Sequence, residues 1–149
     1  MDSIWLTGAQ WLALLRIGLG LWWLESWRHK DKKGWFERGT GIAWAADVAA
    51  KHRWNAVRSG FETVVAPRPR TMAYIVVYAE LAVGLGLVAG LLTPVALVGG
   101  LLLNVLYFTL MIHDWAEQGQ NAMMGLISVV ALFAMSWQKW SLDAALGLF

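Results

Sequence analysis

The chain of 149 residues contains no cysteine. This absence excludes disulfides, thiolate metal sites, cysteine-ligated iron–sulfur clusters and persulfide chemistry. The sequence also lacks a His-Glu-x-x-His motif, a paired-carboxylate metal motif and a phosphate-binding glycine loop. His29, His52 and His113 are not spaced to supply two axial ligands on opposing helices, so no haem is expected. We therefore expect no resident metal centre or iron–sulfur cluster.

Charge is scarce and is unevenly placed. Charged residues make up 15% of the chain and hydrophobic residues 58%. Ten of the 12 Lys and Arg residues fall between Arg28 and Arg70. Nucleic-acid binding would require a basic face with stacking aromatics on a soluble fold, which this composition does not favour. Lys and Arg confined to one loop are instead typical of a membrane protein.

The apolar remainder divides into four segments, at about residues 9–27, 71–92, 95–112 and 118–137. A helix needs roughly 20 residues to cross about 30 Å of hydrocarbon. The sequence therefore predicts an all-α fold, with residues 1–149 forming a single membrane domain built as a four-helix bundle. Thr93-Pro94 is expected to form the tight turn between the second and third spans. The N-terminus lacks the basic region of a secretory signal, so we expect the first span to be retained.

The loop charges predict the orientation in the cell (inner) membrane. Cytoplasmic loops collect Lys and Arg, so the loop of residues 28–70 is expected in the cytoplasm and both termini outside. The tryptophans are interpreted as an aromatic belt that marks the two membrane interfaces. Those assigned to the outer interface are Trp5, Trp11, Trp137 and Trp140, and those assigned to the inner interface are Trp22, Trp23, Trp27, Trp35 and Trp115.

The long loop contains an apolar pattern with helical spacing. The residues that recur every three or four positions are Ala43, Ala46, Ala50, Trp54, Val57, Phe61 and Val64. This pattern predicts an interfacial amphipathic helix over residues 43–64, with a basic face toward the anionic lipid of the inner leaflet. Surface anchoring is the preferred interpretation. A lid over the entrance of a lipid-soluble substrate is the alternative.

Three polar residues lie inside predicted spans: Arg16, Glu80 and Asn104. Placing such side chains in the hydrocarbon of a membrane costs free energy, so they are expected to have a structural or functional role. We expect their side chains to meet near the membrane midplane. The preferred interpretation is an ion pair between Arg16 and Glu80 that locks the bundle. In the alternative, Glu80 and Arg16 relay protons, and Asn104 and Asn121 line a quinone pocket. Asn121 opens the fourth span, where capping of free backbone N–H groups is its default role.

Glycines predict close helix packing. Gly86 and Gly90 form a Gly-x-x-x-Gly pattern with Gly84 beside it, and Gly18, Gly20, Gly99 and Gly100 are further candidates. Small residues allow helix backbones to approach where lipid supplies no hydrophobic drive.

Several parts of the chain resemble DoxX/DoxD-like membrane proteins. Residues 14–22 are similar to their first span, which carries an Arg, then glycine, then a Lys just past the helix. Residues 78–94 resemble their second span and turn, with Glu80 at the acidic position. Asn121 and the segment 141–143 resemble their fourth span and tail. The resemblance implies a four-helix membrane bundle, and some members resemble the membrane subunit of thiosulfate:quinone oxidoreductase.

The resemblance implies a quinone-associated subunit of a membrane oxidoreductase, with thiosulfate or a related sulfur compound as a candidate substrate. With no recognisable electron carrier of its own, the chain would require quinone, a partner membrane or extracytoplasmic subunit, or both. The loop of residues 34–65 is longer than the family pattern and is a candidate docking element. The alternative is a non-catalytic structural subunit that packs within a larger membrane complex. Whether the chain is itself an enzyme stays open at this point.

Overall fold

The computed structural model describes residues 6–149, so Trp5 of the predicted outer belt lies outside the described residues. No strand occurs between residues 6 and 149, which confirms the all-α prediction for that range. The elements in chain order are α1 (Gly8–His29), the π-helix η1 (Gly34–Arg38), α2 (Thr40–Ala50), α3 (Asn55–Gly60), the π-helix η2 (Phe61–Val65), α4 (Pro69–Ala89), α5 (Thr93–Leu110), α6 (Trp115–Phe133) and α7 (Leu142–Leu146).

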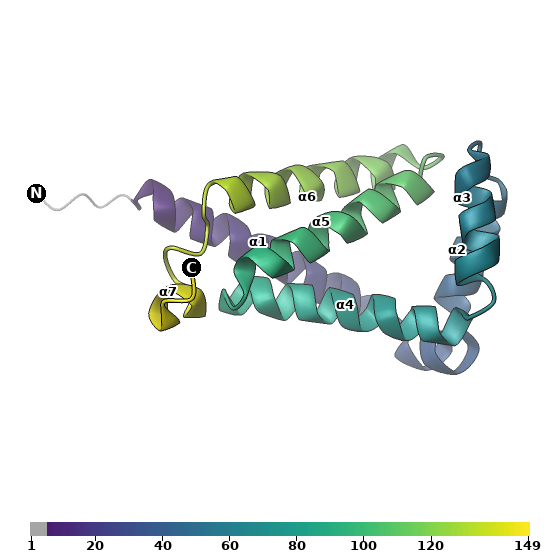
Figure 1. The fold of residues 1–149 in the computed structure, drawn as a ribbon, viewed down its shortest axis with the longest axis horizontal. Helices are drawn as coiled ribbons and strands as arrows, with labels where there is room; N and C mark the ends of the chain where they lie inside the picture. Colours follow the sequence, from purple (N-terminus) through teal and green to yellow (C-terminus); the bar gives the residue numbers. More distant parts are fainter. Residues whose placement is uncertain (1–5) are drawn as a thin grey trace, which may run out of the picture.

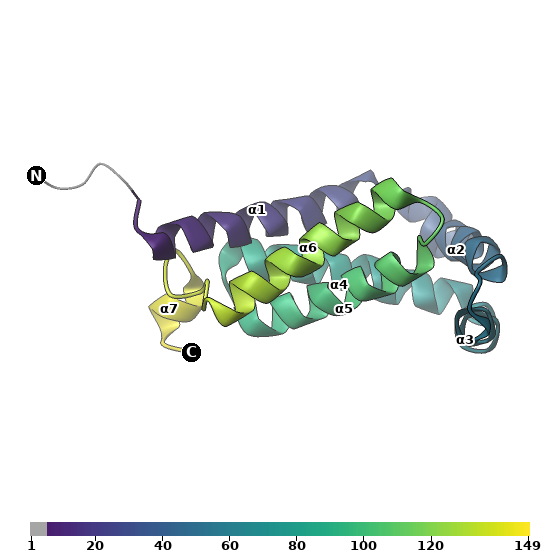
Figure 2. The same ribbon diagram turned by 90° about the horizontal axis from the view of Figure 1, so that it is seen from above.

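Four long helices, α1, α4, α5 and α6, run alongside one another (Figures 1 and 2). The most extensive packing joins α1 to α4 and α5 to α6. The short helices α2 and α3 lie at one end of the long helices, and α7 lies at the other end, beside the start of α1 (Figure 1). Within residues 6–149, two helices, α4 and α5, are long and apolar enough to cross a membrane. Helices α1 and α6 carry more polar side chains along their length.

Two glycines bring α1 and α4 into close contact. A Cβ atom at Gly20 would lie 2.8 Å from the backbone nitrogen of Val88, and one at Gly84 would lie 2.7 Å from Leu24 Cδ2. Gly20 of α1 therefore lies opposite Val88 of α4, and Leu24 of α1 lies opposite Gly84 of α4. A Cβ atom at Gly18, in contrast, would have no atom of a neighbouring helix within 4 Å. The predicted close packing is present, and these two contacts define the register of α1 along α4.

The turn between α4 and α5 lies three residues earlier than predicted. Helix α4 ends at Ala89, and Gly90 caps it in the left-handed conformation with φ 65°. Thr93 and Pro94 belong to the first turn of α5, because a proline at that position needs no hydrogen-bond donor. The Asp143 carboxylate accepts hydrogen bonds from the backbone N–H of Leu92, at 2.7 Å, and of Thr93, at 2.8 Å. The C-terminal segment thereby caps the start of α5.

The single amphipathic helix predicted over residues 43–64 is wrong. The segment is divided into α2, α3 and η2, with a break between Ala50 and Asn55. The imidazole of His52 explains the break, because it is fully buried and bonded on both sides. One ring nitrogen accepts a hydrogen bond from the Trp54 backbone N–H at 3.0 Å, and the other lies 2.9 Å from the Thr109 carbonyl oxygen of α5.

The buried face of α2 also differs from the predicted face. Ile42, Ala45 and Ala49 are buried, whereas Ala43 and Ala50 are exposed. Ala45 and Ala49 form one apolar cluster with Leu110, at the end of α5. The loop between α1 and α4 is therefore packed against the helix bundle, and does not form a separate surface helix.

Candidate functional site

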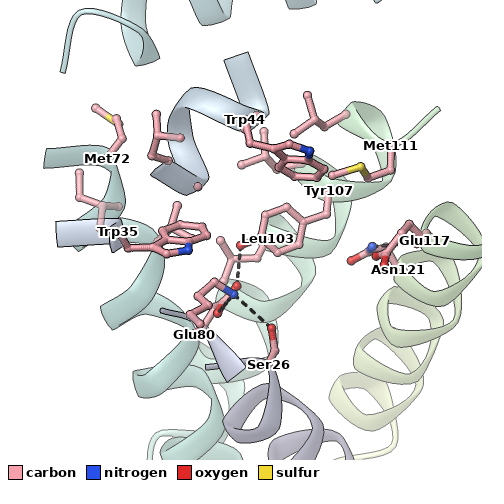
Figure 3. Close-up of a pocket in the computed structure, with 18 of the residues that line it drawn as sticks. Ser26, Trp35, Trp44, Met72, Glu80, Leu103, Tyr107, Met111, Glu117 and Asn121 are labelled. Carbon is pink, nitrogen blue, oxygen red and sulfur yellow. Dashed lines mark hydrogen bonds and ion pairs between the residues drawn. The ribbon is translucent and has the colours of Figure 1, made fainter. Parts of the chain in front are cut away.

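A cavity of about 490 Å³ lies at the end of the bundle that carries α2 (Figure 3). Side chains of α1, α4, α5 and α6 form its walls, and residues of η1, α2 and η2 cover it. The lining is largely apolar and aromatic, and includes Trp22, Trp23, Trp35, Trp44, Phe61 and Met124. A concave, mainly apolar pocket with a few polar groups is the usual form of a small-molecule site.

The polar groups of the pocket centre on Glu80 of α4, whose side chain is fully buried. Glu80 Oε2 lies 2.6 Å from Nζ of Lys30, the residue that follows α1. Glu80 Oε1 accepts a hydrogen bond of 2.6 Å from the hydroxyl of Tyr107 on α5. Lys30 Nζ also donates to Ser26 Oγ at 3.3 Å. Figure 3 shows Ser26 and Glu80 on the same side of the cavity. Both contacts of the carboxylate are short, as charge-assisted hydrogen bonds are.

The predicted ion pair between Arg16 and Glu80 is wrong. The register set by Gly20 and Gly84 places Arg16 opposite the C-terminal end of α4. That level is about 12 residues from Glu80, or roughly 18 Å at the rise of an α-helix, which is farther than an arginine side chain reaches. The Glu80 carboxylate is paired instead with Lys30, which lies toward the other end of the bundle from Arg16.

Arg16 connects the C-terminal segment to the far end of the bundle. Its side chain is fully buried, and Nη2 donates a hydrogen bond of 2.6 Å to the Trp140 carbonyl oxygen. Nη1 lies where a Cβ atom of Gly90 would be. Arg16 therefore holds residues 140–143 against the turn between α4 and α5, and it is not part of the pocket.

The two candidate asparagines are placed differently. Asn121 of α6 lines the pocket and donates from Nδ2 to the Glu117 carbonyl oxygen at 2.8 Å. It does not cap α6, because Asp114 Oδ1 accepts from the first free N–H groups of that helix. Asn104 is buried beside Gly125, one turn from Tyr107, outside the pocket lining. The structure thus brings Asn121 and Glu80 to one cavity, but not Arg16 or Asn104.

Sequence reasoning missed Lys30, Tyr107 and the enclosure of the pocket by tryptophans. Lys30 is one of ten Lys and Arg residues between Arg28 and Arg70, and only the family resemblance distinguishes a Lys just past the first helix. Tyr107 lay in an apolar span with no charged neighbour in sequence. Trp35 lines the pocket and Trp23 is 2% exposed, so the belt interpretation does not describe these two residues. Trp22 also lines the pocket, but 52% of its surface is exposed, so the belt interpretation stays a prediction for this residue.

Within residues 6–149, no group of three or more His, Cys, Asp and Glu side chains is arranged to hold a metal ion. The polar groups of the pocket are suited to hydrogen bonding and proton transfer. Comparisons of the chain with protein-family models, with curated proteins and with solved structures gave no match.

Proposed function

We propose that the chain is a four-span membrane protein, in which α1 and α6 cross the bilayer together with α4 and α5. The support is the apolar character of the outward faces of all four helices. Large apolar side chains exposed on them include Leu21 and Trp22 on α1, Ile75 and Leu85 on α4, Leu102 and Val105 on α5, and Leu126 and Phe133 on α6. Large apolar side chains exposed on all four helices are typical of contact with lipid.

In the proposed orientation, the loop of residues 28–70 faces the cytoplasm and both termini lie outside. A reporter that is active only outside the cytoplasm should therefore be active when fused after Phe149, and inactive when inserted at the exposed Gly60. Activity of a cytoplasm-specific reporter at Phe149 would contradict this topology.

We further propose that the pocket binds a lipid-soluble quinone, and that the chain is a quinone-associated subunit of a membrane oxidoreductase. The observation that carries this proposal is the Lys30–Glu80–Tyr107 cluster in an aromatic, largely apolar cavity. Lys30 uses two of its three N–H donors on Glu80 and Ser26, which leaves one for a quinone carbonyl oxygen. Glu80 is placed to exchange the proton that accompanies quinone reduction.

A partner subunit is part of this proposal. Reduction of a quinone to a quinol consumes two electrons and two protons, and the chain has no recognisable electron carrier. The DoxX/DoxD-like resemblance of residues 14–22 and 78–94 supports a membrane subunit of this kind. In the proposed orientation, the exposed basic residues Lys51 and Arg53 would lie near anionic lipid of the inner leaflet.

The quinone proposal is tested by binding to the purified chain. A short-chain benzoquinone should quench the fluorescence of the pocket tryptophans, with a dissociation constant that can be titrated in mild detergent. Lys30→Met should weaken binding about tenfold, because it removes a charged hydrogen-bond donor. Lys33→Met is the matched control, since Lys33 is exposed and lies outside the pocket. Equal affinities of the wild type and Lys30→Met would contradict the proposed site.

A structural accessory subunit is the second candidate function. It is favoured by an apolar groove between α4 and α5, of about 510 Å³, whose lining includes the small residues Ala79, Ala82, Gly86, Ala89, Ala96 and Gly99. Small residues of this kind allow close approach of another helix. A complex whose quinone reductase activity is unchanged by Glu80→Gln would favour this candidate over the quinone site.

A further inference from the structure

The pocket also has the composition of a site for an organic cation. Its lining contains one cationic side chain, Lys30, and three acidic ones, Glu80, Asp114 and Glu117. Four tryptophans and Tyr107 line the same cavity. Aromatic faces attract ammonium groups through their quadrupole, most strongly when water is excluded. A buried carboxylate among tryptophans therefore favours a positive charge at this position.

The Lys30 ammonium group already shows how a cation is held there. Its Nζ lies 2.6 Å from Glu80 Oε2 and 5.2 Å from the ring centroid of Trp35. The side chain thus has an ion-pair partner and an aromatic face at the same time. These are the two contacts that a ligand ammonium group would require.

Lys30 is placed so that it can leave this position. It follows the last residue of α1 with an extended backbone, and its side chain is 13% exposed, whereas Glu80 has no exposed surface. A lysine at a helix end can extend its charged group toward water while its stem stays on apolar surface. If a ligand cation replaced it, Glu80 would exchange one ammonium partner for another and would not be left unpaired.

We propose that the pocket binds lipophilic ammonium ions in competition with the side chain of Lys30. The ammonium group lies between Glu80 and Trp35, and the apolar part of the ligand lies against the remaining tryptophans. This goes beyond the quinone function and requires no electron transfer. The two proposals are separable, because loss of the Lys30 side chain weakens quinone binding and strengthens cation binding.

The test compares two probes of the same shape. One is the (3-phenylpropyl)trimethylammonium ion, and the other is its uncharged analogue with a tert-butyl group in place of the trimethylammonium group. Binding is measured by tryptophan fluorescence and by the ligand-dependent rise in Tm. We expect the wild type to bind the cation about fivefold more tightly than the analogue, as a buried cation–aromatic contact implies. Lys30→Met should bind the cation about tenfold more tightly than the wild type, because its buried Glu80 carboxylate lacks a cationic partner.

Two further variants keep the test decisive if Lys30→Met does not fold. Glu80→Gln should bind the cation and the analogue equally. Trp35→Leu should lower the preference for the cation about threefold, as the loss of one cation–aromatic contact implies. Trp115→Leu is the control, because Trp115 is 85% exposed and outside the pocket. Equal affinity for both probes in the wild type, or an unchanged preference in Glu80→Gln, would overturn the proposal.

Discussion

Replacement of Lys30 by methionine should destabilise the protein by about 3–5 kcal/mol, which is the cost of leaving a buried charge without its partner. Glu80 has no exposed surface from which it could reach water. Glu80→Leu should cost less, about 1–3 kcal/mol, because the surviving Lys30 side chain is partly exposed and can turn toward solvent. The two replacements differ in cost because Glu80 is fully buried and Lys30 is partly exposed. An ion pair with both side chains exposed would not show this difference.

A double-mutant cycle in bicelles provides the measurement, with the free energy of unfolding from denaturant titration. The double variant Lys30→Met/Glu80→Leu should be less destabilised than the sum of the single variants. Arg16→Met combined with Glu80→Leu is the matched control. Those two changes should be additive within about 0.5 kcal/mol, because residues without shared partners do not couple. Coupling of Glu80 with Arg16, and none with Lys30, would contradict the pairing of Glu80 with Lys30.

The second large effect is expected for Gly90→Ala, with a loss of about 3 kcal/mol or more. Gly90 has φ 65°, a conformation that costs an ordinary residue roughly 1–2 kcal/mol. The new Cβ would also overlap Nη1 of Arg16 and would lie 2.7 Å from the Cα of Ser141. Arg16 could not keep both its position and its bond to the Trp140 carbonyl oxygen. A buried donor without a partner adds about 1–3 kcal/mol.

Gly147→Ala separates the two contributions. Gly147 has φ 64°, and a Cβ atom added there would have no atom within 4 Å. Gly147→Ala should therefore lose only the free energy that the left-handed conformation costs. Thermal unfolding monitored by circular dichroism should therefore show a clearly larger decrease in Tm for Gly90→Ala than for Gly147→Ala. Equal decreases would mean that the contact between Arg16 and the turn does not contribute to stability.

Much of the helix arrangement could be predicted from the sequence. The apolar run of residues 9–27 corresponds to α1, Gly8–His29, and the run of residues 71–92 to α4, Pro69–Ala89. The length of an apolar run and the breaks at charged residues or proline are local properties, so they are readable along one chain. The isolation of Glu80 in an apolar segment also identified the residue on which the pocket centres.

The break between α2 and α3 depends on a contact between residues far apart in the sequence, which the local residue pattern does not indicate. The apolar spacing of residues 43–64 is compatible with a continuous helix. His52 nevertheless bonds the Thr109 carbonyl oxygen of α5, 57 residues away, and the chain turns around the buried imidazole. The side chains that the loop directs into the pocket, Trp35 and Trp44, follow from this folding of the loop against the bundle.

Sequence by itself determined that the chain is helical, the extents of its long helices to within a few residues, and which charged side chains lie inside apolar segments. The tertiary structure decided which of those charges meet. The position of a residue along its own helix follows from its number in the sequence. The register and rotation of one helix relative to another depend on the side chains packed between them. Here Gly20 and Gly84 set that register. It places Lys30 beside Glu80 and Arg16 at the opposite end of the bundle, beside the C-terminal segment.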